Sequence, residues 1–289
     1  MADPRIKAAL KSREFIAAPG VYDLISALIA DRMGFKALYV TGYGVVASYL
    51  GLPDAGIATY RDMVERIGQI AQMTRTPIIA DADTGYGGLL NVRHTVRGYE
   101  QAGVTAIQLE DQEFPKKCGH TPGRRVIPLD EMAQKIRVAS DSRSSSDFLI
   151  VARTDSRTSL GIDEALRRGE AFVKAGADVI FIEAPETEQE MIAIADRIGV
   201  PVLANLVNGG RTPMLTAARL AEIGYAAAIY PAAGFLSAAA AFESAYSEIR
   251  DRGTSTDATP MYSFQDFTQM IGFQDIWDFE KRYGIAGKP

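Results

Sequence analysis

The sequence predicts a (β/α)8 barrel, an α/β fold, with an extra C-terminal helical segment. Short apolar runs rich in β-branched residues alternate with longer amphipathic stretches along the 289-residue chain. This alternation is typical of repeated β-α units around a parallel sheet. Eight such runs can be counted, and eight strands close a barrel of this kind. Because α/β barrels of about 250 residues routinely fold as one unit, we expect a single barrel domain over 1–289, with a helical tail over 260–289.

The eight predicted strands are short, and most follow a residue that ends a helix. Glycine stands between a helical stretch and a strand at four places, where it can adopt the left-handed conformation that terminates helices. Proline precedes two further strands, and the residue before a proline disfavours helix. The predicted strands are Phe15–Ala18, Ala37–Val40, Ile78–Ala80, Ala106–Leu109, Phe148–Ala152, Val179–Ile182, Val202–Ala204 and Ala226–Tyr230.

Charge and composition argue against several classes of protein. The formal net charge of -5 disfavours nucleic acid or an anionic membrane as a partner, because both attract clustered Lys and Arg. The sequence shows no 18-residue apolar run and no apolar segment typical of a signal-peptide h-region. With a single cysteine, Cys118, no intrachain disulfide can form, so we expect a cytoplasmic protein. One cysteine and two histidines are also too few for a structural zinc site.

Polar residues that could serve a ligand follow nearly every predicted strand. In a (β/α)8 barrel the carboxyl ends of the strands form the catalytic face. Several carboxylates would converge there, and such a cluster raises pKa values or requires a cation. At any single position, a charged residue that merely marks the end of a strand is an equally good explanation. The residues are Asp23, Thr41, Asp81 with Asp83, Glu110 with Asp111, Arg153 with Asp155, Glu183 and Asn205.

Asp81 and Asp83 end the third predicted strand at positions i and i+2, which face the same side of a strand. With Glu110 at the end of the next strand they predict a site made only of oxygen ligands. Such a site suits Mg²⁺ or Mn²⁺, with waters and substrate oxygens completing the shell. On this spacing alone, acids that simply face solvent remain the alternative.

A long connection over 112–130 departs from the β-α repeat and contains Lys116, Lys117, Cys118, Gly119 and His120 in sequence. Loops of this length on the catalytic face of a barrel are usually functional lids. A cysteine beside lysines and a histidine has neighbours that favour the thiolate or easy proton exchange. The alternative is an ordinary thiol without a catalytic role.

These motifs together resemble the isocitrate lyase/phosphoenolpyruvate mutase superfamily. The resemblance extends from Pro19–Asp23 to the aromatic tail, and within the superfamily it is greatest to the 2-alkylmalate lyase group and to methylisocitrate lyase. The closer match rests on Thr41–Gly44, on Phe114 with Pro115, and on Ile182–Pro185. The motifs that carry the wider resemblance are Leu52–Asp54, Asp81–Gly87, Leu109–Gln112, Lys116–His120 and Ala152–Asp155.

The resemblance implies a Mg²⁺-dependent lyase that cleaves a 2-hydroxy dicarboxylate into a 2-oxo acid and a carboxylate through an enolate. The substrate would be a small di- or tricarboxylate of the 2-alkylmalate or methylisocitrate type. Asp81 would bind Mg²⁺ directly, with Mn²⁺ as a substitute. Asp83, Glu110 and Asp54 would hold the metal through waters.

The same resemblance implies roles for residues around the metal. The turn of Thr41, Gly42 and Tyr43 would bind the carboxylate of the oxo acid together with Arg153, and Tyr22 would belong to the substrate-binding set. The residues implied in catalysis or in the pocket wall are Cys118 as acid/base, Lys116 and His120 as its support, and Glu183 and Asn205.

Three alternatives to this function stay open. A phosphonopyruvate or carboxyphosphonoenolpyruvate mutase-type reaction is disfavoured by Cys118, because those relatives generally lack this cysteine. An oxaloacetate hydrolase would share nearly every catalytic residue. A non-catalytic barrel that only binds a ligand would be expected to have lost part of the set of Asp81, Asp83, Glu110 and Cys118, and all four are present.

The segment Pro260–Tyr283 predicts helix and carries an aromatic face that requires burial. Because eight β-α units already complete the barrel, this face must cover the chain's own surface or a neighbouring chain. Members of the resembled superfamily exchange their last helices between subunits. We therefore expect a homotetramer, a dimer of helix-swapped dimers.

Overall fold

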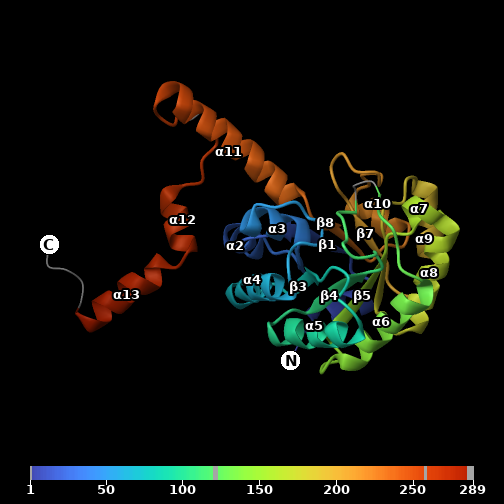
Figure 1. The fold of residues 1–289 in the computed structure, drawn as a ribbon. Coiled ribbons are helices and arrows are strands. Elements are labelled where there is room, and N and C mark those ends of the chain that lie inside the picture. Colours follow the sequence, from blue (N-terminus) through green and yellow to red (C-terminus); the bar gives the residue numbers. More distant parts are fainter. Residues whose placement is uncertain (1, 120–122, 257–258, 285–289) are drawn as a thin grey trace. The chain divides into compact units, whose positions relative to one another are not determined.

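A computed structural model describes residues 2–119, 123–256 and 259–284 (Figure 1). The chain divides into two compact units, Met1–Phe235 and Leu236–Pro289. All eight strands belong to the first unit, and the second consists of helices. The expected single domain over 1–289 with a tail over 260–289 stays a prediction.

Eight parallel strands form a barrel in the first unit, which confirms the predicted fold class. Hydrogen-bonded neighbours follow the order β6-β5-β4-β3-β2-β1-β8-β7. A parallel bridge between Ile180 and Val202 joins β6 to β7 and closes the ring. Figure 1 shows helices around the outside of these strands. The strands are β1 (Ile16–Val21), β2 (Leu38–Val40), β3 (Ile78–Asp81), β4 (Ala106–Glu110), β5 (Leu149–Thr154), β6 (Val179–Ile182), β7 (Leu203–Asn205) and β8 (Ala227–Tyr230).

Several helices begin at side chains that accept hydrogen bonds from the first turn. The Asp23 carboxylate accepts from Ser26 N at the start of α2, and the Thr59 hydroxyl accepts from Asp62 N at the start of α4. These caps satisfy backbone donors that have no partner within the helix. The side chain of Asp23 therefore caps the amino end of α2. The helices of the first unit are α1 (Arg5–Lys11), α2 (Leu24–Asp31), α3 (Gly42–Leu50), α4 (Tyr60–Met73), α5 (Leu89–Gln101), α6 (Leu129–Ser142), α7 (Arg157–Leu160), α8 (Ile162–Lys174), α9 (Glu188–Arg197) and α10 (Ala217–Glu222).

Five strands run further toward the catalytic face than the apolar runs predict. β3 ends at Asp81, β4 at Glu110, β5 at Thr154 and β7 at Asn205, while β1 continues to Val21. The backbone ladder continues past the last apolar residue because N–H and C=O groups pair regardless of side-chain polarity. Polar residues of the candidate site therefore lie on the strands themselves, where the sheet holds their backbones.

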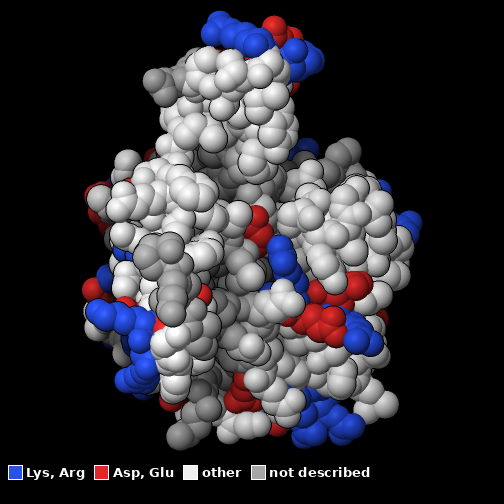
Figure 2. All heavy atoms as spheres, turned by 90° about the vertical axis from the view of Figure 1, so that its left-hand side faces the viewer, with Lys and Arg blue, Asp and Glu red and all other residues white. Residues whose placement is uncertain are grey.

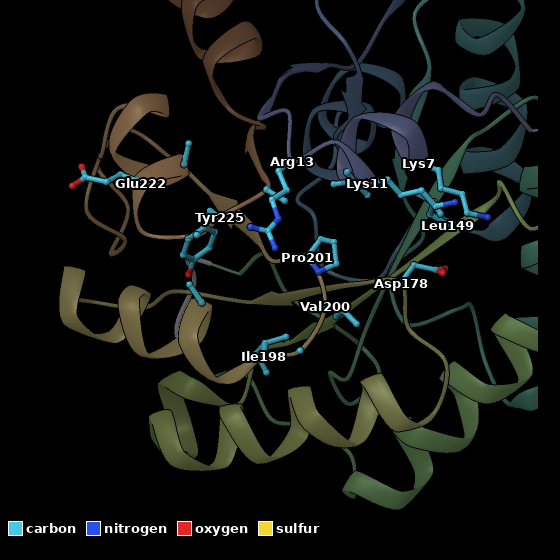
Figure 3. A pocket seen from close by; sticks show the side chains of 16 residues that line it. Lys7, Lys11, Arg13, Leu149, Asp178, Ile198, Val200, Pro201, Glu222 and Tyr225 are labelled. Atoms are coloured by element: carbon cyan, nitrogen blue, oxygen red, sulfur yellow. The ribbon is translucent and has the colours of Figure 1, made fainter.

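Helix α1 closes the opposite end of the barrel. Its Ile6 and Ala9 belong to the cluster of apolar side chains that fills the barrel interior. A cavity with a volume of about 780 Å³ lies beside this helix. Arg13, Pro201 and Tyr225 are among the residues that line it (Figure 3). Its walls come from α1, α9 and α10 and from residues at or just before the amino ends of β5 to β8. In barrels of this type that end serves stability, and the active site lies at the other end.

The second unit contains most of α11 (Ala233–Arg252), together with α12 (Phe264–Met270) and α13 (Phe273–Tyr283). None of the described residues in these three helices is buried. Phe264 is 86% exposed, and Phe242, Trp277 and Phe279 are about half exposed. Pairs such as Phe242 and Tyr246, whose rings stack at a centroid distance of 5.9 Å, cover only part of this apolar surface. The unit therefore has no apolar core of its own among its described residues.

Charged side chains of both signs are interspersed with uncharged residues on the face drawn in Figure 2. Several surface charges are paired, for example Arg197 with Glu170 at 2.7 Å. Within the described ranges, no helix has both the length and the apolar character needed to cross a membrane.

Candidate active site

The carboxyl ends of the strands bring most of the predicted site residues together inside the first unit. The carboxylates Asp54, Asp81, Asp83 and Glu110 are all buried. The buried set also includes Tyr22, Thr41, Gly42, Lys116, Arg153, Glu183 and Asn205, whereas Tyr43 is exposed and Cys118 is half-buried.

Asp81 is fixed by donors on both of its carboxylate oxygens. Oδ2 accepts from the backbone N–H of Gly42 at 3.3 Å. Oδ1 accepts from the backbone N–H of Asp83 at 3.1 Å and from the side chain of Gln108 at 3.3 Å. A Cβ on Gly42 would lie 2.6 Å from Asp81 Oδ2, so only glycine permits this approach. The turn at the start of α3 therefore packs directly against the predicted metal ligand.

The segment after Asp81 adopts an unusual backbone in which Asp83 (φ 48°) and Tyr86 (φ 58°) occupy the left-handed region. Such conformations are costly for residues other than glycine and persist only where the surroundings impose them. The Tyr86 hydroxyl lies 2.8 Å from the Tyr99 hydroxyl, and Tyr99 donates to the backbone carbonyl of Asp81 at 3.2 Å. The backbone of Glu110 donates to the carbonyl of Asp83 at 2.9 Å. These contacts hold the two aspartates against β4.

Lys116 places its ammonium group between two of the acids. Nζ lies 2.5 Å from Asp54 Oδ1 and 2.6 Å from Asp83 Oδ1. Burial raises the pKa of Asp83 to about 6, an effect that Lys116 opposes and that Asp81 and Asp54 reinforce. Burial alone would lower the pKa of Lys116, but the surrounding carboxylates raise it well above its ordinary value. Lys116 is therefore a fixed positive charge inside the acid cluster.

Arg153 is surrounded by three carboxylates. Its Nε and Nη2 donate to the two oxygens of Asp155, both at 2.9 Å. Nη1 lies 3.4 Å from Glu110 Oε2, and Nη2 lies 3.2 Å from Glu183 Oε2. Asn205 in turn donates to Glu183 Oε2 at 3.1 Å. The guanidinium is thereby locked in orientation and remains charged.

The carboxyl group of Glu110 is buried among charged side chains. Burial raises its pKa well above the ordinary value, although the neighbouring Arg153 opposes the shift. Gln112 donates to Glu110 Oε1 at 2.9 Å. Asp155 and Asp81 reinforce the shift, so Glu110 belongs to a group of like charges that a bound cation would stabilise.

The loop after β4 lies directly over these groups. The backbone N–H of Cys118 donates to the carbonyl of Asp54 at 3.2 Å. The side chain of Gln112 holds Lys117 by donating to its carbonyl at 2.8 Å and accepting from its N–H at 3.0 Å. A Cβ on Gly119 would lie 2.2 Å from Arg153 Nη2, so the loop touches the guanidinium. His120 lies outside the described residues.

The aromatic residues predicted to bind substrate form one side of the site. The ring of Phe235 contacts Tyr43 edge-on at a centroid distance of 5.2 Å and Tyr22 at 6.2 Å. Gly44 packs so closely on Tyr22 that a Cβ there would lie 2.7 Å from the Tyr22 Cβ. The Tyr22 side chain therefore packs against the Thr41–Gly44 turn at Gly44.

The donor set fits a hard divalent cation such as Mg²⁺. Its members are buried carboxylate oxygens, which Mg²⁺ prefers, and the cation commonly takes one or two carboxylates directly and keeps several waters. No group of three or more His, Cys, Asp or Glu side chains within the described ranges converges tightly enough to hold an ion by itself. The assignment of Asp81 as a direct ligand, with Asp83, Glu110 and Asp54 holding the ion through waters, stays a prediction.

Two residues that the sequence motifs do not single out orient Asp81 from inside the barrel. Tyr39 donates to the amide oxygen of Gln108 at 2.9 Å, which leaves the Gln108 NH₂ group facing Asp81. Burial raises the pKa of Tyr39 well above its ordinary value, so its hydroxyl stays a donor. Both residues lie within apolar runs that predict strands. The available signal was spacing, because Gln108 and Glu110 stand at i and i+2 and share a face.

The sequence profile described as phosphoenolpyruvate phosphomutase matches residues 6–250. The chain belongs to this family. Its relatives include the 2,3-dimethylmalate lyase of Eubacterium barkeri, 46% identical over 283 residues that cover 98% of each protein. The 2-methylisocitrate lyase of Aeropyrum pernix is 41% identical over 278 residues, 96% of this chain and 88% of that protein. The resemblance to the isocitrate lyase/phosphoenolpyruvate mutase superfamily is confirmed, and so is the prediction of a carbon–carbon lyase.

Solved structures of the superfamily share the fold along nearly the whole chain. An oxaloacetate acetylhydrolase with bound 3,3-difluorooxalacetate matches with a TM-score of 0.91 and 36% identity, covering 98% of this chain and 97% of that one. A phosphonopyruvate hydrolase in complex with oxalate and Mg²⁺ matches with a TM-score of 0.87 and 31% identity, covering 98% and 99%. Proteins named for different reactions thus share the scaffold of this chain.

Proposed function

We propose that this member of the family is a Mg²⁺-dependent lyase that cleaves a 2-hydroxy dicarboxylate of the 2-alkylmalate or methylisocitrate type into a 2-oxo acid and a carboxylate. The observation that carries the proposal is the loop over the acid cluster, where the Cys118 backbone is held 3.2 Å from the Asp54 carbonyl. The thiol would thereby be delivered to the edge of a buried site that contains the fixed cations Lys116 and Arg153.

The reaction breaks the bond between C2 and C3 of the substrate. A base takes the proton of the C2 hydroxyl, which becomes the carbonyl of the 2-oxo acid, while the bonding electron pair passes to C3 as an enolate. Cys118 would donate a proton to C3, since a thiol with a pKa near neutrality can act as a general acid. Arg153 would clamp a substrate carboxylate, because a guanidinium can donate two parallel hydrogen bonds to it.

Mg²⁺, when bound, would chelate the hydroxyl and carboxylate oxygens of the substrate and lower the pKa of the hydroxyl. The residues that would hold it are Asp81 directly and Asp83, Glu110 and Asp54 through waters. The buried oxygen donors and the Mg²⁺ named with the related phosphonopyruvate hydrolase support this assignment. The Thr41–Tyr43 turn would offer backbone N–H groups to the oxo-acid carboxylate.

A substrate panel tests the proposal. Turnover of 2,3-dimethylmalate, methylisocitrate, oxaloacetate and phosphonopyruvate would be compared with Mg²⁺ present, by measuring the 2-oxo acid or oxalate released. Cleavage of a 2-hydroxy dicarboxylate is expected to dominate. Turnover of phosphonopyruvate alone would contradict it.

A second candidate is hydrolysis of oxaloacetate to acetate and oxalate. It is supported by the TM-score of 0.91 to an oxaloacetate acetylhydrolase, since a 2,3-dimethylmalate lyase structure matches with a TM-score of 0.90. The same panel separates the two candidates, because only the hydrolase releases oxalate from oxaloacetate.

The assembly we propose is a homotetramer of helix-swapped dimers in the cytoplasm. Support comes from the exposed aromatic side chains of α11 to α13, which find no apolar core within their own unit. Leaving such side chains in water forgoes about 1.5 to 3 kcal/mol each. A second copy of the chain is the partner that would cover them. The single cysteine supports a reducing compartment.

A further inference from the structure

Arg124 comes from the far side of the same long loop and is buried against β5. Its Nη1 donates to Asp155 Oδ1 at 2.5 Å, and its Nη2 donates to the hydroxyl of Thr158 at 2.9 Å. The residue is only 8% exposed, although it belongs to a surface connection. A buried charge in a loop is costly unless it is paired, so this contact has to be well satisfied.

Asp155 is also the carboxylate that orients Arg153. Its Oδ1 receives hydrogen bonds from both Arg124 Nη1 and Arg153 Nη2, while its Oδ2 receives one from Arg153 Nε. The backbone N–H of Asp155 is held by Asp111 Oδ1 at 2.9 Å. Asp155 therefore stands between a guanidinium that faces the site and a second guanidinium behind it.

The balance of charge shows what the second guanidinium contributes. Arg153 faces Asp155, Glu110 and Glu183, so its single positive charge is shared among three carboxyl groups. Arg124 offsets the charge of Asp155. In a buried site with a low effective dielectric, an uncompensated carboxylate repels an incoming anion over several ångströms.

We propose that Arg124 is a positioning residue that acts through Asp155, offsetting the charge of this carboxylate so that Arg153 stays electrostatically available for the carboxylate of the substrate. The inference rests on the proposed function, since it assigns Arg153 to an anionic substrate. It adds a residue outside the predicted metal, substrate and acid/base sets. The loop thus supplies Arg124 as well as Lys116 and Cys118 to the site.

The test measures the affinity of the full-length, Mg²⁺-loaded protein for oxalate by titration calorimetry, which needs no turnover. Arg124→Met should weaken oxalate binding about 10-fold or more, the size expected for one uncompensated charge at an effective dielectric of about 20. Arg125→Met is the matched control, because Arg125 is the next residue of the loop and its exposed side chain pairs with Glu113 at the surface. Oxalate affinity should be unchanged in the control.

A merely structural role for Arg124 is separated by adding Asp155→Asn. If Arg124 acts by offsetting the Asp155 charge, the double variant should bind oxalate more tightly than Arg124→Met alone. A double variant that binds no better than Arg124→Met would overturn the proposal. Should Arg124→Met not fold, Arg124→Gln removes the charge but keeps a donor to Asp155, and the same loss is expected.

Oxalate binding separates a failure of the proposed function from a failure of the role proposed for Arg124. A wild-type protein that binds neither oxalate nor pyruvate would overturn the proposed function and this inference together. Normal binding by the wild type with unchanged affinity in Arg124→Met would overturn the inference about Arg124 alone.

Discussion

Replacing Gly42 by alanine tests whether the approach of α3 to Asp81 is essential. A Cβ at position 42 would lie 2.6 Å from Asp81 Oδ2 and 3.1 Å from its Cγ, whereas ordinary contact begins at 3.4 Å. The carboxylate must then withdraw by about 0.8 Å, and a misplacement of about 1 Å in a catalytic group costs on the order of 100-fold in rate. We therefore expect kcat to fall by about 50- to 100-fold in Gly42→Ala.

The assay would measure kcat at saturating substrate together with Mg²⁺ affinity by calorimetry, since both depend on the position of Asp81. Gly88→Ala is the matched control, because Gly88 follows the Asp81–Gly87 segment, has a φ of -80°, and has no atom within 4 Å of the added Cβ. The control should behave as wild type. If Gly42→Ala kept both its kcat and its Mg²⁺ affinity within twofold of wild type, the assignment of Asp81 as metal ligand would be wrong.

Three further predictions concern the metal, the acid and the assembly. Chelation with EDTA should abolish turnover and added Mg²⁺ or Mn²⁺ should restore it, because the acid cluster supplies only oxygen donors; full activity without metal would exclude the proposed site. Cys118→Ser should lower kcat by roughly 100-fold with little change in thermal unfolding, as is typical for loss of a positioned proton donor, and near-normal turnover would favour the phosphonate branch of the superfamily. Truncation after Pro260 should give smaller, less stable and inactive species in analytical ultracentrifugation; a fully active 31.3 kDa wild-type monomer at micromolar concentration would refute the tetramer.

The fold could be predicted from the sequence because its signal is repetitive. Each β-α unit repeats the same hydrophobic pattern, so an error in the predicted end of one strand leaves the number of predicted strands unchanged. The predicted strand ends fell short at positions such as Asp81 and Asn205, where a polar side chain continues a strand. Hydrophobicity reports which residues face a core, whereas hydrogen bonding between strands decides where a strand stops.

The site could be predicted only in part, because spacing along the chain does not encode side-chain partners. The sequence placed Asp155 after the fifth strand without indicating that it would join Arg153 to Arg124, a residue 31 positions earlier in the chain. The sequence likewise indicated Lys116 only as a support for the thiol of Cys118. The structure shows that Lys116 also lies between Asp54 and Asp83. Such long-range pairs depend on the path of the loop.

The loop over the acid cluster links the electrostatics of the site to the placement of the thiol. Lys116 is paired with Asp54 and Asp83, and two residues later the Cys118 backbone is bonded to the carbonyl of Asp54. The position of Cys118 therefore depends on the same carboxylates that are proposed to hold Mg²⁺ through waters. A change of charge at Asp54 or Asp83 would displace Lys116 and, with it, the segment that carries the thiol. Metal binding and proton donation would consequently be lost together, even though no single residue performs both.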